Sequence, residues 1–271
     1  MKQIMPFVLS ETVTFTATAQ NAGTSPKFQW RVNGINQGSN GSNTTFPTPS
    51  NFQTGSIVTV VLTPDCENSS PVTSNSISTT VNALPTVNAG TAVSPICQGG
   101  TTGPLGGSYG GGATSAVWTA DVAGGTFSNN SGNTPNTATY TAASNAQGII
   151  TLTLTTSGGS CGTVSATKAL SINPNPTVNV GGNISAICQG GTTSALGGSF
   201  GGGATGAIWS DGGAGGTFAN NSGSTPNTAT YTAASNAPSS ITLTLTTAGG
   251  SCGAISATKA FTVNPNPTVN A

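Results

Sequence analysis

Hydrophobic and polar residues alternate along much of this chain. The clearest case is Ile150–Thr156, which reads Ile-Thr-Leu-Thr-Leu-Thr-Thr, and Ile241–Thr247 has the same order. Alternation with a period of two, rich in β-branched residues, is typical of a strand with one face in a core. We expect Ile and Leu to point inward and Thr outward. The chain contains no long stretch with the apolar spacing of a helix.

Further short strands are expected between these two segments and around them. Clusters of Gly and Asn separate the strands, as turns require, because Gly adopts positive φ without strain and Asn tolerates it. Many short strands separated by turns at regular intervals predict an all-β fold of sandwich type. In one copy of the repeat described next, the expected strands are Ala116–Ala120, Thr126–Ser128, Thr137–Ala142 and Thr163–Ile172.

A long segment occurs twice almost unchanged. Residues 86–176 recur as 177–267, so that Cys97, Trp118, Tyr140 and Cys161 return 91 positions later as Cys188, Trp209, Tyr231 and Cys252. A fixed period of this size indicates tandem structural modules. We therefore expect a first module at 1–84, a first repeat at 85–176, a second repeat at 177–267 and the start of a further repeat at 268–271.

The first module differs in sequence from the repeats but shows the same kind of pattern. Its strand candidates lie within Glu11–Ala19, Lys27–Gly34, Thr54–Thr63 and Ser74–Val81. A strand with a central Trp between two others is typical of an immunoglobulin-like sandwich, with Trp30 at its core. The linkers, Ala83–Pro85 and Asn173–Pro176, are short and contain proline. Such linkers favour stiff, extended backbone, so the modules are expected to form a rod.

Composition excludes several classes of function. Charged residues make up 4% of the chain, with five Lys and Arg, five Asp and Glu, and no His. A chain without a basic surface has nothing to neutralise phosphates, so we expect no nucleic-acid partner. No run of apolar residues is long enough to cross a membrane as a helix, so we expect no membrane insertion.

The sequence offers no recognisable catalytic or metal-binding group. Nucleophilic catalysis by Ser or Cys generally needs a neighbouring base, and the chain has no His. The repeats hold one acid each, Asp121 and Asp211, at positions that are not equivalent. We predict no catalytic residues, no cofactor, no metal and no enzyme activity. Lys168 and Lys259, which are equivalent, are expected to be exposed on edge strands.

Each repeat carries two cysteines, and two interpretations remain open. The favoured one is a disulfide within each repeat, Cys97 with Cys161 and Cys188 with Cys252, which suits an oxidising, extracellular setting. The alternative is that each repeat holds two buried free thiols. The spacing does not fit a zinc site. Cys66 has no partner within its own module.

The aromatic residues of the repeats fit a core better than a binding surface. Trp118 and Trp209 lie in apolar strand patterns, and Tyr140 and Tyr231 follow in another expected strand. We expect these four and Trp30 to be core residues. The alternative for the two repeat tryptophans is an exposed ring that stacks on a sugar.

Several strings in the chain resemble those of a known family. They are PTVNAG, ICQGGTT, LGGS, WSDGGAGGTF, ITLTLTT, GGSCG, ATKAFTVNPNPTV and QWRVNG. They resemble the tandem immunoglobulin-like repeats of large secreted surface proteins of Bacteroidota, which include gliding-motility-associated adhesins exported by the type IX secretion system. The resemblance covers nearly the whole chain and implies an extracellular or cell-surface location.

Pattern and resemblance together favour a non-enzymatic structural role. The first hypothesis is a stalk segment of a bacterial surface adhesin, whose partners are the neighbouring repeats of the same chain. A second is a self-assembling extracellular filament or surface-layer subunit, because neutral sandwiches have little charge repulsion to prevent the pairing of sheet edges. A third, weaker hypothesis is a carbohydrate-binding module with a surface polysaccharide as its partner.

Overall fold

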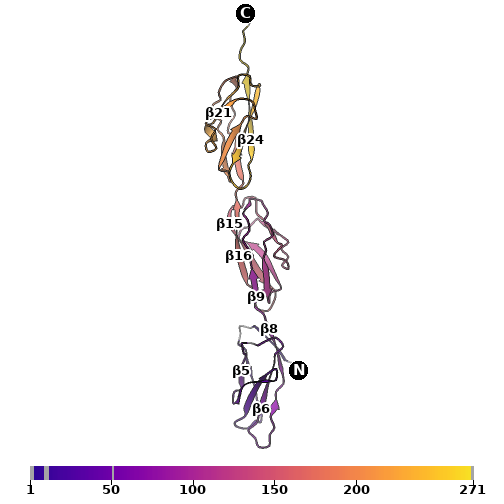
Figure 1. Cartoon of the computed structure of the whole chain (residues 1–271). Helices are drawn as coiled ribbons and strands as arrows, with labels where there is room; N and C mark the ends of the chain where they lie inside the picture. Colours follow the sequence, from indigo (N-terminus) through magenta and orange to yellow (C-terminus); the bar gives the residue numbers. More distant parts are fainter. Residues whose placement is uncertain (1–2, 9–11, 51, 270–271) are drawn as a thin grey trace.

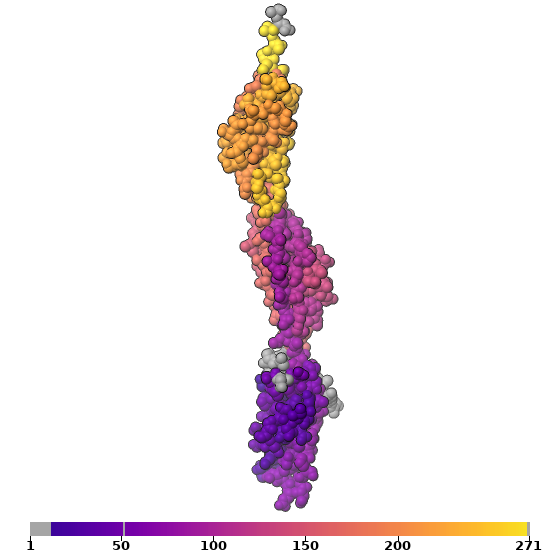
Figure 2. Space-filling view, in the orientation of Figure 1, coloured from indigo at the N-terminus to yellow at the C-terminus, as the bar shows by residue number. Residues whose placement is uncertain are grey.

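The computed structural model shows three β-sandwiches in line, joined end to end (Figure 1). The structure describes residues 3–8, 12–50, 52–269; the last part of the expected further repeat, residues 270–271, lies outside them. The space-filling view shows a narrow rod with the first module at one end and the second repeat at the other (Figure 2). Within the described residues, the only helical segment is a 3-10 turn, η1 (Pro226–Thr228). The predicted all-β tandem sandwich is therefore confirmed.

The first repeat is built around a four-stranded sheet in the order β10-β16-β15-β12. Two small two-stranded sheets, β9 with β11 and β13 with β14, complete the sandwich. Strand β10 pairs with β16 in parallel, whereas β16, β15 and β12 are antiparallel. The strands are β9 (Pro85–Asn88), β10 (Ile96–Cys97), β11 (Ser108–Gly111), β12 (Ser115–Ala120), β13 (Thr126–Ser128), β14 (Thr139–Thr141), β15 (Gly148–Ser157) and β16 (Ser165–Asn173).

The alternating pattern forms the central strand of this sheet, as expected. Along β15, the side chains of Ile150, Leu152 and Leu154 are buried, and the threonines between them are half-buried. Inward side chains of β15 pack against Trp118, Tyr140 and Leu170 in one continuous core. Burial of apolar area of this kind stabilises a domain by about 25 cal/mol per Å² removed from water.

The second repeat has the same architecture. Its main sheet has the order β18-β24-β23-β20, with the pairs β17–β19 and β21–β22 beside it. The core again contains Trp209, Tyr231 and the leucines of β23. The strands are β17 (Pro176–Asn179), β18 (Ile187–Cys188), β19 (Ser199–Gly202), β20 (Gly206–Ser210), β21 (Thr217–Ala219), β22 (Thr230–Thr232), β23 (Ser240–Ala248) and β24 (Ser256–Asn264).

The first module uses related pairing with a larger sheet. The sheet runs β1-β8-β6-β3-β4, with β7 beside β6, and β2 pairs with β5 in a second sheet. Strand β1 pairs with β8 in parallel, as β10 does with β16. The strands are β1 (Gln3–Val8), β2 (Thr14–Thr16), β3 (Lys27–Val32), β4 (Ile35–Gly41), β5 (Thr45–Pro47), β6 (Ile57–Thr63), β7 (Val72–Thr73) and β8 (Ile77–Asn82).

Trp30 lies on β3 in the core of the first module. Its ring stacks on Phe46 of β5, with the ring centroids 5.6 Å apart, and its indole N–H donates to the carbonyl of Asn43 at 3.2 Å. The ring thus joins the two sheets. Pattern analysis did not predict β1, β4 or β5, because these segments lack a clean alternation of apolar and polar residues.

Candidate functional site

The predicted core aromatics of the repeats are enclosed by protein. Trp118 and Trp209 are 1% and 2% exposed, and each indole N–H donates to a proline carbonyl, of Pro135 and Pro226 respectively, at 3.0 Å. Tyr140 and Tyr231 are also buried. A ring with so little exposed surface cannot stack on a sugar, so these tryptophans do not form a carbohydrate site in the folded repeats.

The prediction for the two lysines of the repeats is wrong. Lys168 is 8% exposed, although it lies in a part of β16 that pairs with β15 alone, because β10 pairs only with Ile172 and Asn173. Its ammonium group donates to the carbonyls of Thr91 and Leu105 at 2.8 and 2.5 Å and lies 5.2 Å from the centre of the Trp118 ring. Burial lowers the pKa of Lys168 below its ordinary value.

Lys259 repeats this arrangement with the carbonyls of Gly182 and Leu196 and with the Trp209 ring. Burial lowers the pKa of this ammonium as well. Long aliphatic stems let both lysines cross apolar surface and reach polar partners at the end. Both side chains thus tie loops to the main sheet.

The structure overturns the predicted pairing of cysteines within each repeat. Cys97 of the first repeat forms a disulfide with Cys252 of the second, with 5.7 Å between their Cα atoms and a sequence separation of 155. Cys161 and Cys188 are free thiols, half-buried and exposed respectively. The reason is geometric: Cys97 pairs with the end of β16, and Cys161 lies on the β15–β16 hairpin at the opposite end of the same sandwich. Cysteines so far apart cannot form a bond.

Packing of glycines fixes the position of the hairpin that carries Cys252. The hairpin between β23 and β24 contains Gly249 and Gly250, both with positive φ. A Cβ at Gly249 would lie 1.8 Å from Oγ1 of Thr205, and one at Gly250 would lie 2.1 Å from the carbonyl oxygen of Gly203. Only glycine fits such close approach. The hairpin therefore lies tightly on the base of its own repeat and presents Cys252 towards the first repeat.

The linker between the repeats is held on both sides. Asn175 donates from its backbone N–H to Oε1 of Gln98 at 2.9 Å and from its side chain to the Gln98 carbonyl at 3.2 Å. The carbonyl of Asn175 accepts from the N–H of Gly203 in the second repeat at 3.2 Å. Gln98 follows Cys97 directly, so the hydrogen bonds and the disulfide hold the same end face. We call this contact region junction 2.

At junction 1, the contact region between the first module and the first repeat, the described residues form no counterpart of these links, and Leu9, the position equivalent to Gln98, lies outside them. Strand register places Val8 opposite Asn82, where Cys97 lies opposite Asn173 in the first repeat. Leu84 occupies the linker position of Asn175, and it is 48% exposed. Its carbonyl still accepts from the N–H of Gly112 at 3.2 Å, equivalent to the bond from Gly203. The linker is therefore held by the repeat, and within the described part of the chain only junction 2 shows side chains that tie a linker to the preceding sandwich.

The three unpaired cysteines lie at ends of the sandwiches, at positions equivalent to those of Cys97 or Cys252. Cys161 lies on the hairpin of the first repeat that corresponds to the one with Cys252. Cys188 is paired in register with Asn264, as Cys97 is with Asn173. Cys66, which is exposed, lies on the loop between β6 and β7, the first module's counterpart of these hairpins. The cysteines of the two repeats recur at a constant interval in the sequence. This interval is compatible with pairing between repeats and equally with pairing within them.

Titratable groups are few, and the two repeats differ in one of them. Asp211 accepts hydrogen bonds from the N–H groups of Gly213 and Gly216 and from the hydroxyl of Tyr231 at 3.0 Å. These bonds outweigh the effect of burial and lower the pKa of Asp211. Burial and the Asp211 carboxylate raise the pKa of Tyr231 to about 12.

In the first repeat, Asp121 instead accepts from the N–H of Thr151, and the hydroxyl of Tyr140 is buried without a hydrogen-bond partner. Burial and the charge of Asp121 raise the pKa of Tyr140. Asp121 thus accepts from a strand residue, Thr151, whereas Asp211 accepts from the glycines of the turn that follows it. Neither arrangement pairs an acid with a second titratable group at a surface where a substrate could bind.

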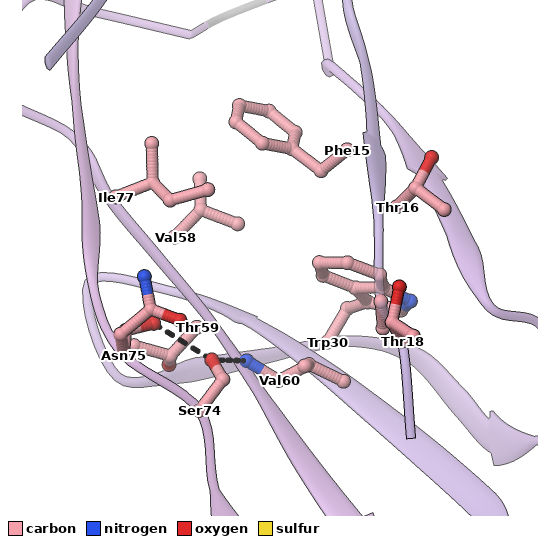
Figure 3. A pocket seen from close by; sticks show the side chains of 11 residues that line it. Phe15, Thr16, Thr18, Trp30, Val58, Thr59, Val60, Ser74, Asn75 and Ile77 are labelled. Carbon is pink, nitrogen blue, oxygen red and sulfur yellow. Dashed lines mark hydrogen bonds between the residues drawn. The ribbon is translucent and has the colours of Figure 1, made fainter. Parts of the chain in front are cut away.

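The cavities of the first module are small or open. One of about 130 Å³ lies between Phe15, Trp30, Val58 and Ile77, between the two sheets (Figure 3). Its polar wall is satisfied, since Ser74 accepts from the N–H of Val60 and donates to the carbonyl of Asn75. A second, open cleft of about 370 Å³ lies at junction 1 between Phe52 and Leu84. Neither contains a titratable side chain.

Among residues 3–8, 12–50 and 52–269, no three His, Cys, Asp or Glu side chains are grouped closely enough to hold a metal. The described chain also has no helix long and apolar enough to span a membrane.

Comparison with known proteins supports the fold. No family model and no curated protein sequence matches the chain. The N-terminal eight immunoglobulin domains of the Down syndrome cell adhesion molecule match with a TM-score of 0.53 and 15% identity over 98% of this chain. The chain spans 36% of the length of that structure. At this identity the likeness shows the fold alone, a tandem array of immunoglobulin-like sandwiches.

Weaker likenesses include cadherin domains 1–5 of protocadherin gamma B2 and the insect immune protein hemolin. The protocadherin has a TM-score of 0.45 and 10% identity over 99% of this chain and 60% of its own. Hemolin has a TM-score of 0.40 and 11% identity over 98% of this chain and 74% of its own. Scores at this level do not support an argument about function.

Proposed function

We propose that this chain is a structural, non-enzymatic stalk segment of an extracellular bacterial surface adhesin. Its role is to hold a binding part of the protein at a distance from the surface to which the stalk is attached. The chain itself binds its own neighbouring repeats. The observation that carries the proposal is the Cys97–Cys252 bond, which joins two successive sandwiches instead of stabilising one of them.

The geometry of junction 2 supports a spacer of fixed direction. A disulfide and the Gln98–Asn175 hydrogen bonds act on one end face, so relative rotation of the repeats would break several contacts at once. Interfaces between domains are usually small and permit relative motion unless they are large and hydrophobic. A covalent bond across so short a linker is therefore an economical means of keeping two domains aligned.

The surface chemistry supports the same role. Threonine, serine, asparagine and glycine cover the sandwiches, and charged residues make up 4% of the chain. A surface of this kind is solvated but offers few groups for specific recognition. The inter-repeat disulfide requires an oxidising compartment, which favours an extracellular location. The bacterial origin rests on the resemblance of the repeat strings to surface proteins of Bacteroidota.

Sedimentation velocity and small-angle scattering of the whole chain test the proposal. We expect a monomer whose high frictional ratio does not change with concentration, and whose largest dimension is that of three sandwiches in line. Reduction of the disulfide is the matched control, since it should broaden the distribution of dimensions without unfolding the modules. A compact particle would contradict the stalk. Growth into fibres with rising concentration would instead support the filament hypothesis.

A glycan array tests the remaining alternative. The stalk hypothesis predicts no saturable binding to surface polysaccharides by the full chain. Saturable binding of a glycan would favour a carbohydrate-binding module. In that case Trp118→Phe, which keeps an aromatic ring in the core, should leave binding intact, and substitution of an exposed residue at the glycan site should abolish it.

A further inference from the structure

The end face that bonds to the hairpin at junction 2 occurs a second time at the far end of the second repeat. At junction 2 the face consists of Cys97, Gln98, Asn173 and Asn175. The corresponding residues at the far end are Cys188, Gln189, Asn264 and Asn266. Both cysteines close a short parallel pair with the asparagine that ends the last strand.

The second face is already formed without a neighbour. The N–H of Gln189 donates to the carbonyl of Asn264 at 3.0 Å, as Gln98 does to Asn173. The N–H of Asn266 donates to Oε1 of Gln189 at 3.4 Å, the counterpart of the Asn175–Gln98 bond. The side chain of Gln189 is further held by the carbonyl of Ala237 at 2.9 Å. Docking at this face therefore needs little rearrangement.

Cys188 is exposed and unpaired, whereas its counterpart Cys97 is bonded. What occupies the Cys97 face is the tip of a β-hairpin, Gly249–Gly253, with the sequence Gly-Gly-Ser-Cys-Gly. Cys252 also lies 3.6 Å from the carbonyl of Asn173, so the hairpin contacts both residues of the parallel pair. The linker that brings this hairpin into place, Asn173–Pro176, recurs letter for letter as Asn264–Pro267.

We propose that the face around Cys188 is a docking site for the Gly-Gly-Ser-Cys-Gly hairpin of a further repeat joined behind Pro267, and that Cys188 forms a disulfide with the cysteine of that hairpin. The rule is that the first cysteine of each repeat bonds to the second cysteine of the following one. This inference goes beyond the stalk hypothesis, because it depends only on the equivalence of the two faces and holds for any role of the rod.

The bond requires an oxidant, which we take to be a small-molecule or protein disulfide. The Cys188 thiolate attacks one sulfur of the oxidant, forms a mixed disulfide and releases one thiol. The hairpin thiolate then attacks the Cys188 sulfur and releases the second thiol. Two thiols of the protein lose two protons and two electrons, and the oxidant's disulfide is reduced to two thiols.

Junction 1 shows what the rule requires. The hairpin of the first repeat has the same form as that of the second: Gly158 and Gly159 have positive φ and approach Thr114 and Gly112 as closely as Gly249 and Gly250 approach Thr205 and Gly203. It carries Cys161 towards the first module. There, the register position of Cys97 holds Val8, which has no thiol. Cys161 accordingly remains free.

The test extends the full chain by one repeat: a copy of residues 181–267, in which the counterpart of Cys188 is replaced by serine, is placed after Ala271. The extended chain is refolded in a mixture of reduced and oxidised glutathione, alkylated, digested with pepsin and analysed by mass spectrometry. We expect one crosslinked peptide pair for Cys97 with Cys252 and a second for Cys188 with the appended hairpin cysteine, both in monomers. Labelling of Cys188 by a maleimide should fall from near-complete in the original chain to almost none.

Two variants of the extended chain serve as controls. Cys188→Ser should abolish the second crosslink and leave the first, and Cys161→Ser should change neither. The Cys97–Cys252 crosslink reports that the repeats are folded in every sample. The proposal is overturned if that crosslink forms while Cys188 stays open to alkylation. It is also overturned if Cys188 bonds instead to Cys66 or Cys161 of another molecule, which would appear as covalent dimers.

Discussion

Junctions 1 and 2 join sandwiches of the same kind, each with two residues between the flanking strands (83–84 and 174–175), yet only one of them is covalently closed. At both, a linker carbonyl accepts from a glycine N–H, Gly112 at one and Gly203 at the other. Junction 2 adds the disulfide and the Gln98 hydrogen bonds. Alignment of the modules thus has two separable sources: a backbone clamp common to both junctions and, at junction 2, side-chain links made by Cys97 with Cys252 and by Gln98 with Asn175.

The largest expected effect is loss of the disulfide. When the second repeat unfolds alone, Asn173 and Cys252 stay attached to the folded first repeat and close a loop with a sequence separation of 79. In the chain-entropy model, a crosslink over such a loop stabilises by about 4–5 kcal/mol. Cys97→Ser should therefore lower the free energy of unfolding of both repeats by up to about this amount.

Hydrogen exchange with peptide resolution during denaturant titration measures this effect. The first module lies outside the loop and is an internal reference whose protection should not change. Cys188→Ser removes an equivalent but unpaired thiol and should change stability by less than about 0.5 kcal/mol. Equal stability of Cys97→Ser and the parent chain would show that the bond does not form in solution.

Giving junction 1 the missing thiol should make the two junctions alike. Val8→Cys places a cysteine at the register position of Cys97, opposite the hairpin with Cys161. We expect a disulfide between the two under mild oxidation and a gain of up to about 4 kcal/mol for the first repeat, less if the new bond is strained. Peptide mapping and denaturant unfolding measure both quantities.

The matched control for this variant is Val8→Ser, which cannot form the bond. If the thiols of Val8→Cys remain free in an otherwise folded chain, the first module meets the first repeat at a different angle from that of the two repeats at junction 2.

The backbone clamp can be tested at both junctions with equivalent substitutions. Gly111 and Gly202 have φ of +63° and +62°, and an added Cβ would lie 1.9 and 2.0 Å from the carbonyl oxygens of Leu84 and Asn175. We expect Gly111→Ala and Gly202→Ala each to cost about 2 kcal/mol or more. Scattering should show module reorientation for Gly111→Ala alone, since the disulfide still aligns the repeats in Gly202→Ala. A Cβ at Gly182 meets nothing within 4 Å, so Gly182→Ala is the control.

The smallest expected effect on stability is a difference between the two repeats in the role of their core tyrosine. Tyr231→Phe removes a hydrogen bond to the Asp211 carboxylate and should destabilise the second repeat by about 1.5 kcal/mol. Tyr140→Phe removes a hydroxyl that has no partner and should be neutral or slightly stabilising. Thermal unfolding of the single variants measures both, and equal destabilisation would contradict the assigned hydrogen bonds.

The pH dependence of the stability of the second repeat follows from the pair Asp211 and Tyr231. The pKa of Asp211 is lower in the folded state, so its contribution is present above its unfolded pKa near 3.8 and is lost as pH falls below it. The pKa of Tyr231 is raised from 10.0 to about 12, so its contribution is present below pH 10 and is lost as pH rises towards 12. The second repeat should lose more stability than the first at both extremes, as followed by hydrogen exchange at each pH.

The fold could be predicted from the chain because its determinants are local. The alternation at Ile150–Thr156 and the turn glycines constrain the backbone within one module, and the near-identical repeat implies that the next module has the same fold; the structure agrees with each. The burial of Lys168 was missed because a charged residue in a strand reads as solvent-facing, although its partners are the carbonyls of distant loops.

The disulfide pairing could not be predicted, because a period of 91 residues fixes the spacing of cysteines without fixing which end of a sandwich each occupies. That requires strand order: Cys97 lies beside the end of β16, and Cys161 lies before its start. Likewise, the significance of Val8 depends on a parallel strand pair that no pattern in the sequence reveals.

The bond between Cys97 and Cys252 also decides how the molecule responds when it is stretched from its two ends. Tension passes along the backbone to Cys97, crosses the sulfur atoms and continues from Cys252, so the residues between them carry no load even when both repeats unfold. Reduction would release a separation of 155 residues, about 540 Å of extended chain at roughly 3.5 Å per residue. In an optical trap, a reductant should therefore add this length to the unfolding of the two repeats and leave the extension from the first module, which lies outside the bond, unchanged.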